Sequence, residues 1–232
     1  MKLLSIQVGL PRSLGLADAP ELMDRTWTSG IHKETITGSV AVSLTGLVGD
    51  GQADLKNHGG LDKAINAYPA DHFAAWKTEL GLNFSAGAFG ENFTTCDLLE
   101  TEACIGDSFK IGDLVVQITQ PRQPCWKLAR RWHLKDFAAR VEQTGRTGWY
   151  FRVLETGTVS APADFVLLGR PHPEWTIAAA NEVMYRRKTD WDAALALGSC
   201  PALSESWRVA LTLRAQTRTL ASDEKRLGGN NP

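Results

Sequence analysis

Cys125 is the residue whose surroundings in this 232-residue chain most favour chemistry. It ends the segment 117–125, in which an apolar run stops at two prolines and a helix-like pattern begins directly afterwards. Proline fixes φ and biases the preceding residue to an extended backbone, so Cys125 projects from a stiff segment. Because the thiol lies near a helix start and near Arg122, Lys127 and Arg130, we expect its thiolate to be favoured.

A thiolate in such a setting is suited to act as a nucleophile or as a metal ligand. The alternative is that Cys125 is a small buried hydrophobe, which is the usual fate of a free cysteine. The residues around one cysteine do not separate these interpretations.

Two further polar segments are framed by glycines, Lys56 to Gly60 and Gly87 to Asn92. Glycine allows backbone N–H groups to approach a ligand closely, and successive N–H groups form an anion-binding nest. The alternative is that these glycines only form turns and that the nearby charges are solvated.

Several side chains in or near these segments have the chemistry to hold an anionic heterocycle. Lys33, Lys56, His58 and Arg122 supply positive charge, and the guanidinium of Arg122 can form two parallel bonds to a phosphate. Asn92 both donates and accepts hydrogen bonds, which suits the amide edge of a ring. A lone histidine such as His58 is otherwise an ordinary loop residue.

Composition narrows the class of protein. The formal net charge of −1 argues against a general nucleic-acid or membrane-surface binder, so we expect neither partner. The first apolar run, residues 3–8, is too short for a signal peptide or a membrane span. Four cysteines without CxxC spacing suit a reducing compartment, and we therefore expect a cytoplasmic protein.

Short runs of alternating apolar residues, separated by turn signals, predict a mainly β protein over residues 1–170. Examples are residues 3–8, 40–44 and 114–119, and repeated turn signals at 105–107 and 111–113 predict a hairpin around Phe109. Short helices are predicted from Pro69 to Leu80, after Cys125, and around Phe137. Many short strands with few helices indicate a β-barrel or sandwich with small helical insertions.

The composition changes near residue 170, and the strand patterns stop there. Residues 171–220 predict a three-helix bundle, with Asp190 and Ser204 as N-caps of the second and third helices. We expect this bundle to pack on the barrel without chemistry of its own. Residues 221–232 are polar and are expected to form a disordered tail.

Five segments, taken together in this order, resemble the MOSC domain, in particular its YiiM-like branch with a C-terminal three-helix extension. They are residues 46–54 (Gly-Leu-Val-Gly-Asp-Gly-Gln-Ala-Asp), 58–64 (His-Gly-Gly-Leu-Asp-Lys-Ala), 87–92 (Gly-Ala-Phe-Gly-Glu-Asn), 120–125 (Gln-Pro-Arg-Gln-Pro-Cys) and 148–153 (Gly-Trp-Tyr-Phe-Arg-Val). Asp164 matches a family Gly-Asp pair, but here Ala163 precedes it, which changes the local turn.

The resemblance implies a MOSC-type β-barrel that binds the molybdenum cofactor, a phosphorylated pterin, with Cys125 as the protein ligand to the metal. It also implies reduction of small N-hydroxylated compounds, such as hydroxylamino-purines or amidoximes, with electrons from a separate redox protein. We place the cofactor among a set of residues that bind it: Lys33, His58, Asn92, Arg122 and Cys125. Glu91 and His58 are alternative proton donors that the sequence does not separate.

Two other functions remain open at this point. One is a non-catalytic carrier of the cofactor or of its sulfur, which would use the same binding residues. The other is a thiol hydrolase that uses Cys125 and His58, although the chain has no known hydrolase signature around them. The physiological substrate, the electron donor and the oligomeric state do not follow from the sequence.

Overall fold

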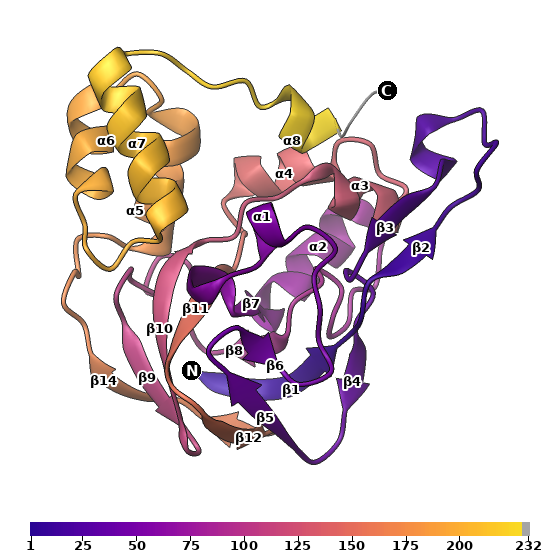
Figure 1. The fold of residues 1–232 in the computed structure, drawn as a ribbon, viewed down its shortest axis with the longest axis horizontal. Coiled ribbons are helices and arrows are strands. Elements are labelled where there is room, and N and C mark those ends of the chain that lie inside the picture. Colours follow the sequence, from indigo (N-terminus) through magenta and orange to yellow (C-terminus); the bar gives the residue numbers. More distant parts are fainter. Residues whose placement is uncertain (229–232) are drawn as a thin grey trace.

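The structure, a computed structural model, describes residues 1–228, and a nine-stranded mixed sheet forms the centre of this part (Figure 1). In spatial order its strands are β13 (Ala163–Asp164), β1 (Lys2–Val8), β8 (Phe93–Cys96), β7 (Ile65–Pro69), β11 (Trp149–Glu155), β10 (Leu114–Pro121), β9 (Ser108–Ile111) and β14 (Val166–Gly169), with β4 (Glu34–Ile36) also paired to β1. β7 and β8 run parallel, whereas the other neighbours are antiparallel. The sheet curls into a half-barrel.

Two smaller sheets complete the β part. One contains β12 (Gly157–Ser160), β5 (Ser39–Ser43) and β6 (Gly46–Leu47), and the other contains β2 (Arg12–Leu14) and β3 (Trp27–Ser29). Val40, Val42 and Val159 from the first of them are buried in the core of the main sheet. The predicted mainly β fold with small helical insertions is therefore confirmed.

Four short helices are inserted between the strands: α1 (Leu55–His58), α2 (Phe73–Leu80), α3 (Trp126–Trp132) and α4 (Phe137–Thr144). The predicted helix around Phe137 is confirmed, and it ends at Gly145, whose φ of 73° is left-handed. The predicted start of α2 at Pro69 is wrong, because Pro69 is the last residue of β7 and a 3₁₀ turn separates it from the helix.

β10 forms a hairpin with β9, as predicted, and leads toward Cys125. Leu114, Val116 and Ile118 alternate along it and are fully buried, but Val115 between them is buried too, so both faces of the strand are largely covered. Thr119 and Gln120 at its far end are also buried, although they are polar. Ser204 covers this end of the strand, because its N–H donates to the Thr119 carbonyl and its hydroxyl to the Gln120 side chain.

The three-helix extension is also confirmed. It consists of α5 (Ile177–Asn181), which continues as one π-helical turn (Glu182–Arg186), α6 (Trp191–Gly198) and α7 (Glu205–Thr217). Asp190 and Ser204 cap α6 and α7 through their side chains, as predicted. No helix among residues 1–228 is long and apolar enough to cross a lipid bilayer.

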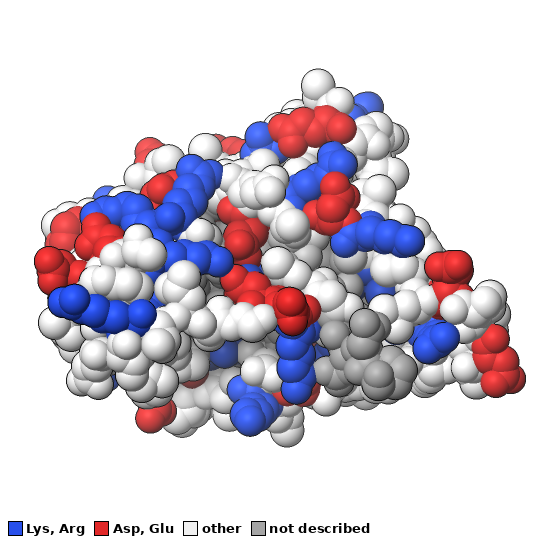
Figure 2. Space-filling model, turned by 90° about the horizontal axis from the view of Figure 1, so that it is seen from above, with Lys and Arg blue, Asp and Glu red and all other residues white. Residues whose placement is uncertain are grey.

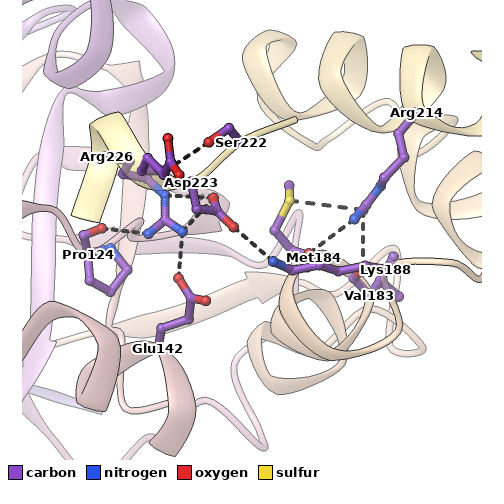
Figure 3. A network of polar contacts seen from close by, with 10 residues as sticks. Pro124, Glu142, Val183, Met184, Lys188, Arg214, Ser222, Asp223 and Arg226 are labelled. Atoms are coloured by element: carbon purple, nitrogen blue, oxygen red, sulfur yellow. Dashed lines mark hydrogen bonds and ion pairs between the residues drawn. The ribbon is translucent and has the colours of Figure 1, made fainter. Parts of the chain in front are cut away.

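The end of the chain corrects the expectation of a disordered tail. Residues 218–223 cross from α7 to α8 (Glu224–Gly228), which lies beside α3 and α4 (Figure 1). Arg226 holds this segment by donating to the Pro124 carbonyl oxygen at 2.7 Å and to Glu142 at 2.6 Å (Figure 3). The composition of the tail shows that it is polar, but it does not show that Arg226 bonds to residues far away in the sequence. Residues 229–232 of the predicted tail lie outside the described residues.

The extension and the barrel share one hydrophobic core. Ile177, Trp207 and Leu211 from the helices belong to the same buried cluster as Ile105 and Ile118 from the sheet. The domain boundary near residue 170 stays a prediction. The barrel and the extension pack together through this core.

We therefore expect Trp207→Ala to lower the free energy of unfolding of the whole chain by about 3–5 kcal/mol, because it empties a large volume in this shared core. Thermal unfolding followed by far- and near-ultraviolet circular dichroism should show one cooperative transition at a lower temperature. Leu213→Ala, an exposed position on the same helix, should change stability little. Separate melting of the helical part would contradict a shared core.

Candidate functional site

An inner cavity of about 70 Å³ lies beside Cys125, and the segments singled out in the sequence converge on it. The structure places all five predicted cofactor-binding residues on its wall: Lys33, His58, Asn92, Arg122 and Cys125. Asn66 from β7 and Tyr150 from β11 line it as well. Residues from distant parts of the sequence therefore surround one thiol.

The turn after β10 fixes the position of Cys125. Pro121 ends the strand, and Cys125 has extended dihedral angles (φ −136°, ψ 168°) as the N-cap of α3. Its carbonyl oxygen accepts from the N–H of Leu128 at 3.0 Å. Its Sγ lies 3.8 Å from Nε2 of His58, within reach of a hydrogen bond to sulfur.

The Cys125 thiol has a lowered pKa. Burial raises this pKa, but the hydrogen bond and charge of His58, the charge of Arg122 and the backbone N–H of Lys127 together outweigh burial and lower it to about 7. The lowering of the thiol pKa, predicted from the helix start and the basic neighbours, is thus assigned to particular residues. A large fraction of the thiol is ionised at neutral pH.

His58 reaches the thiol because the segment 54–60 folds back sharply. Asp54 caps α1 by accepting from the N–H of Asn57 at 3.1 Å, and the helix ends at His58 after one turn. Gly60 has a φ of 93°, which a residue with a side chain rarely adopts, and this lets the chain turn toward β7. The glycines of this segment therefore position an imidazole.

Two residues that line the cavity each have a buried polar atom without a hydrogen-bond partner among residues 1–228. These atoms are Nη1 of Arg122, a residue that is 5% exposed, and Oδ1 of Asn66, a residue that is 8% exposed. Leaving such atoms unsatisfied costs about 1–3 kcal/mol each, so native structures rarely do so without a ligand or water. A guanidinium N–H suits an anionic oxygen, and an amide oxygen suits a ring N–H.

Lys33 and Asn92 line the cavity, but neighbouring protein groups engage them. Lys33 forms a buried ion pair with Asp50, and Asn92 donates to the same carboxylate at 2.9 Å. Burial lowers the pKa of Lys33, while Asp50 opposes this change. The Asn92 amide also accepts from the N–H of Asn66 at 3.1 Å. Both residues therefore fix the wall of the cavity.

Glu91 does not line the cavity. Its carboxylate is fully buried and accepts from the N–H groups of Gly87 at 2.6 Å and Phe89 at 2.8 Å, and from the hydroxyl of Thr94 at 2.9 Å. Burial raises its pKa, and these hydrogen bonds oppose that change. The structure thus separates the positions of the two candidate proton donors: Glu91 holds the loop 87–91 together, whereas His58 lines the cavity.

Comparison with known proteins agrees with this geometry. Residues 54–164 match the model of the MOSC domain, and residues 175–216 match that of the YiiM-like three-helix domain. The chain is 42% identical over 207 residues to the uncharacterized protein YflK of Bacillus subtilis, covering 89% of this chain and 91% of that one. The chain belongs to the MOSC family.

Two further similarities extend this MOSC assignment. The crystal structure of YiiM from Geobacillus stearothermophilus superposes with a TM-score of 0.77 at 38% identity, covering 92% of this chain and 98% of that one. A protein of Gibberella moniliformis named "Reductase" is 37% identical over 164 residues, which are 69% of this chain and 29% of that protein. MOSC domains as a family bind the molybdenum cofactor.

Asn66 and Asp50 also belong to the site of this MOSC domain, and neither was predicted from the sequence. Asn66 stands in the middle of the buried strand β7, where asparagine is uncommon, and this was an available signal. Asp50 lies among the turn glycines of residues 46–54 and gave no comparable signal. Its importance comes from the contacts with Lys33 and Asn92.

The inner cavity adjoins an outer cavity of about 990 Å³. His58, Cys125 and Tyr150 border both of them. Part of the outer wall comes from the three-helix extension and from residues 219–226. The expectation that the extension only packs against the barrel is therefore incomplete, because it also forms a wall of this cavity.

We expect the Cys125 thiol of cofactor-free protein to titrate with a midpoint near pH 7, rather than near its ordinary value of 9.0. The rate of alkylation by iodoacetamide, measured against pH, reports the thiolate fraction. His58→Gln should shift the midpoint upward, because it removes the hydrogen bond and charge that favour the thiolate. An unchanged midpoint in this variant would exclude His58 as the cause.

We expect Glu91→Gln to lower the free energy of unfolding by about 1–3 kcal/mol, because the amide cannot accept from both backbone N–H groups. Chemical denaturation measures the loss. The midpoint of Cys125 alkylation should stay where it is in the wild type. A large shift of this midpoint without loss of stability would instead assign Glu91 to the chemistry of the thiol.

Proposed function

We propose that this MOSC protein binds the molybdenum cofactor and reduces small N-hydroxylated compounds, such as hydroxylamino-purines or amidoximes. The observation that carries the proposal is the unpartnered, buried guanidinium N–H of Arg122 beside a thiol with a pKa of about 7. A soft thiolate is a suitable ligand for a thiophilic metal, and an arginine fork is suitable for a phosphate.

The residues around the cavities fit the cofactor's chemistry. Cys125 would supply the protein ligand to molybdenum, and Arg122 would bind the phosphate. Asn66 would accept a hydrogen bond from the pterin ring through its free Oδ1. Together with the outer cavity, the site has a volume in the range of known small-molecule sites.

When bound, the cofactor supplies the two-electron redox chemistry needed to cleave an N–O bond. Among the protein groups, His58 is suited to hold a proton at Nε2 and deliver it to the leaving oxygen. Phe89 and Tyr150 place aromatic rings on the cavity wall. The protein would receive electrons from a separate redox protein, and the free cysteines suit a cytoplasmic location.

Relatives support the reductive chemistry at the level of the family. The Gibberella protein that shares the aligned region is named a reductase. By contrast, a carrier of the cofactor would need the same binding residues but no proton donor beside the thiol. Turnover therefore separates the two functions.

The contact between Cys125 and His58 also suits a thiol hydrolase, which is a second candidate function. Such enzymes orient the histidine through a third group. Among residues 1–228, no hydrogen bond links the His58 ring to a group other than Cys125. The unpartnered Arg122 atom has no role in that mechanism, so we favour the reductase.

We expect wild-type protein made in a host with cofactor biosynthesis to contain about one molybdenum per chain, measured by elemental analysis with pterin fluorescence. Cys125→Ala should lose metal and lower reduction of a hydroxylamino-purine by about 100-fold or more while keeping the same fold. His58→Gln should keep its metal but turn over slowly.

Cys96→Ala is the matched control, because Cys96 is a free cysteine outside both cavities. It should keep both metal and activity. Full activity of Cys125→Ala would remove Cys125 as the ligand. Molybdenum binding without turnover by the wild type, given substrate and a chemical reductant, would favour the carrier instead.

A further inference from the structure

We propose that the outer cavity binds a phosphate group of the substrate, so that this protein acts on N-hydroxylated nucleotides in preference to free bases. The inference rests on the proposed reductase function and names the substrate class for the same site. It follows from the charge and the origin of the residues that line the outer cavity.

Six cationic side chains line the outer cavity without reaching the inner one. They are Lys56, Arg130, Lys188, Arg214, Lys225 and Arg226. Only two carboxylates, Asp54 and Asp223, lie on the same wall. A hollow lined by one sign of charge concentrates the electrostatic potential and attracts ligands of the opposite sign.

Most of this positive charge is not neutralised locally. Asp223 pairs with Lys188 and with Arg226, both at 2.8 Å (Figure 3). Lys56, Arg130 and Lys225 form no ion pair within residues 1–228. The charges of these three cations are therefore not neutralised by a carboxylate of these residues, although Arg130 donates one hydrogen bond to the Arg25 carbonyl oxygen at 2.9 Å.

Arg214 is half-buried, and its charge is likewise not neutralised by a carboxylate of the described residues. It donates to the carbonyl oxygens of Val183 at 3.2 Å and Met184 at 3.1 Å (Figure 3). Carbonyl oxygens satisfy its N–H groups but carry no full negative charge. The charge of the guanidinium thus still contributes to the cavity.

The bias is a local property of this cavity. The chain has a net charge of −1, and positive and negative side chains are interspersed over the face in Figure 2. The positive charge is therefore concentrated in the outer cavity and does not reflect the overall composition of this near-neutral protein. This is the arrangement expected of a binding site for a small anion.

Position separates this anion site from that for the cofactor's own phosphate. Arg122 lines the inner cavity, and its unpartnered Nη1 is buried. Lys188, Arg214 and Lys225 belong to the three-helix extension and to α8, and they line only the outer cavity. The two groups of cations thus suit two different phosphates.

Trp126 places an aromatic ring on the wall of the outer cavity. It follows Cys125 directly, lines the outer cavity and is partly exposed. The guanidinium of Arg130 lies 4.8 Å from the centre of its ring, so aromatic and positive groups are adjacent. A nucleotide has the matching combination of a flat base and a phosphate.

Isothermal titration calorimetry tests the proposal with adenosine 5′-monophosphate and with adenosine, which differ by the phosphate. We expect the monophosphate to bind about tenfold more tightly or better, since its contacts are charge-assisted. The difference should largely disappear in about 1 M salt, where charges are screened beyond about 3 Å. Equal affinities of the two probes would overturn the proposal.

Cofactor-loaded and cofactor-free proteins distinguish the two sources of phosphate. Tighter binding of the monophosphate to both forms supports a substrate site. Binding only to the cofactor-free form would show that the probe occupies the cofactor's own phosphate site, and it would overturn the proposal. Metal content and turnover of a free base are separate measurements, so a failed reductase function would be recognised independently.

Charge-neutralising variants on two different helices, α1 and α8, locate the site. Lys56→Gln and Lys225→Gln should each weaken binding of the monophosphate about threefold, as expected for exposed charges, and leave adenosine binding unchanged. Lys110→Gln is the matched control, since Lys110 is exposed on β9 and lines neither cavity. Equal effects of all three variants would place the interaction elsewhere.

Discussion

The buried side chain of Asn92 joins three segments that lie far apart in the sequence, and the site depends on this junction. Its amide accepts from the N–H of Asn66 in β7 and donates to the carbonyl of Gln7 in β1 and to Asp50. Glu91, the preceding residue, holds the adjoining glycine loop through two backbone N–H groups. Because these groups are shielded from water, breaking any one contact would leave a polar atom unsatisfied. The wall of the inner cavity is therefore held in one arrangement.

Opposing effects determine the ionisation of the Cys125 thiol on that wall. Burial disfavours the charged form of Cys125, whereas His58, Arg122 and the start of α3 favour it. Lys33, by contrast, is paired with Asp50. Within residues 1–228, Arg122 forms no ion pair, and its buried Nη1 has no hydrogen-bond partner. Positive charge therefore remains near the sulfur, which suits an anionic ligand.

The C-terminal extension is part of the same physical system as the barrel. Trp207 and Leu211 join the core of the sheet, while other residues of the same helix line the outer cavity. Arg226 then binds the carbonyl of Pro124, the residue before Cys125. Packing, cavity wall and thiol position are thus connected through one continuous segment at the end of the chain.

The sequence by itself determined the features that depend on neighbouring residues. Prolines and the helix start predicted how Cys125 is presented, Asp190 and Ser204 predicted two helix caps, and alternation predicted β10. The tertiary structure alone decided that Glu91 is enclosed, that Oδ1 of Asn66 is buried without a partner, and that Arg226 fixes the tail. Caps, turns and alternation arise from contacts within a few residues, and residue order encodes these contacts directly. Burial and long-range pairing depend on which distant segments pack together, and a single sequence does not list those neighbours.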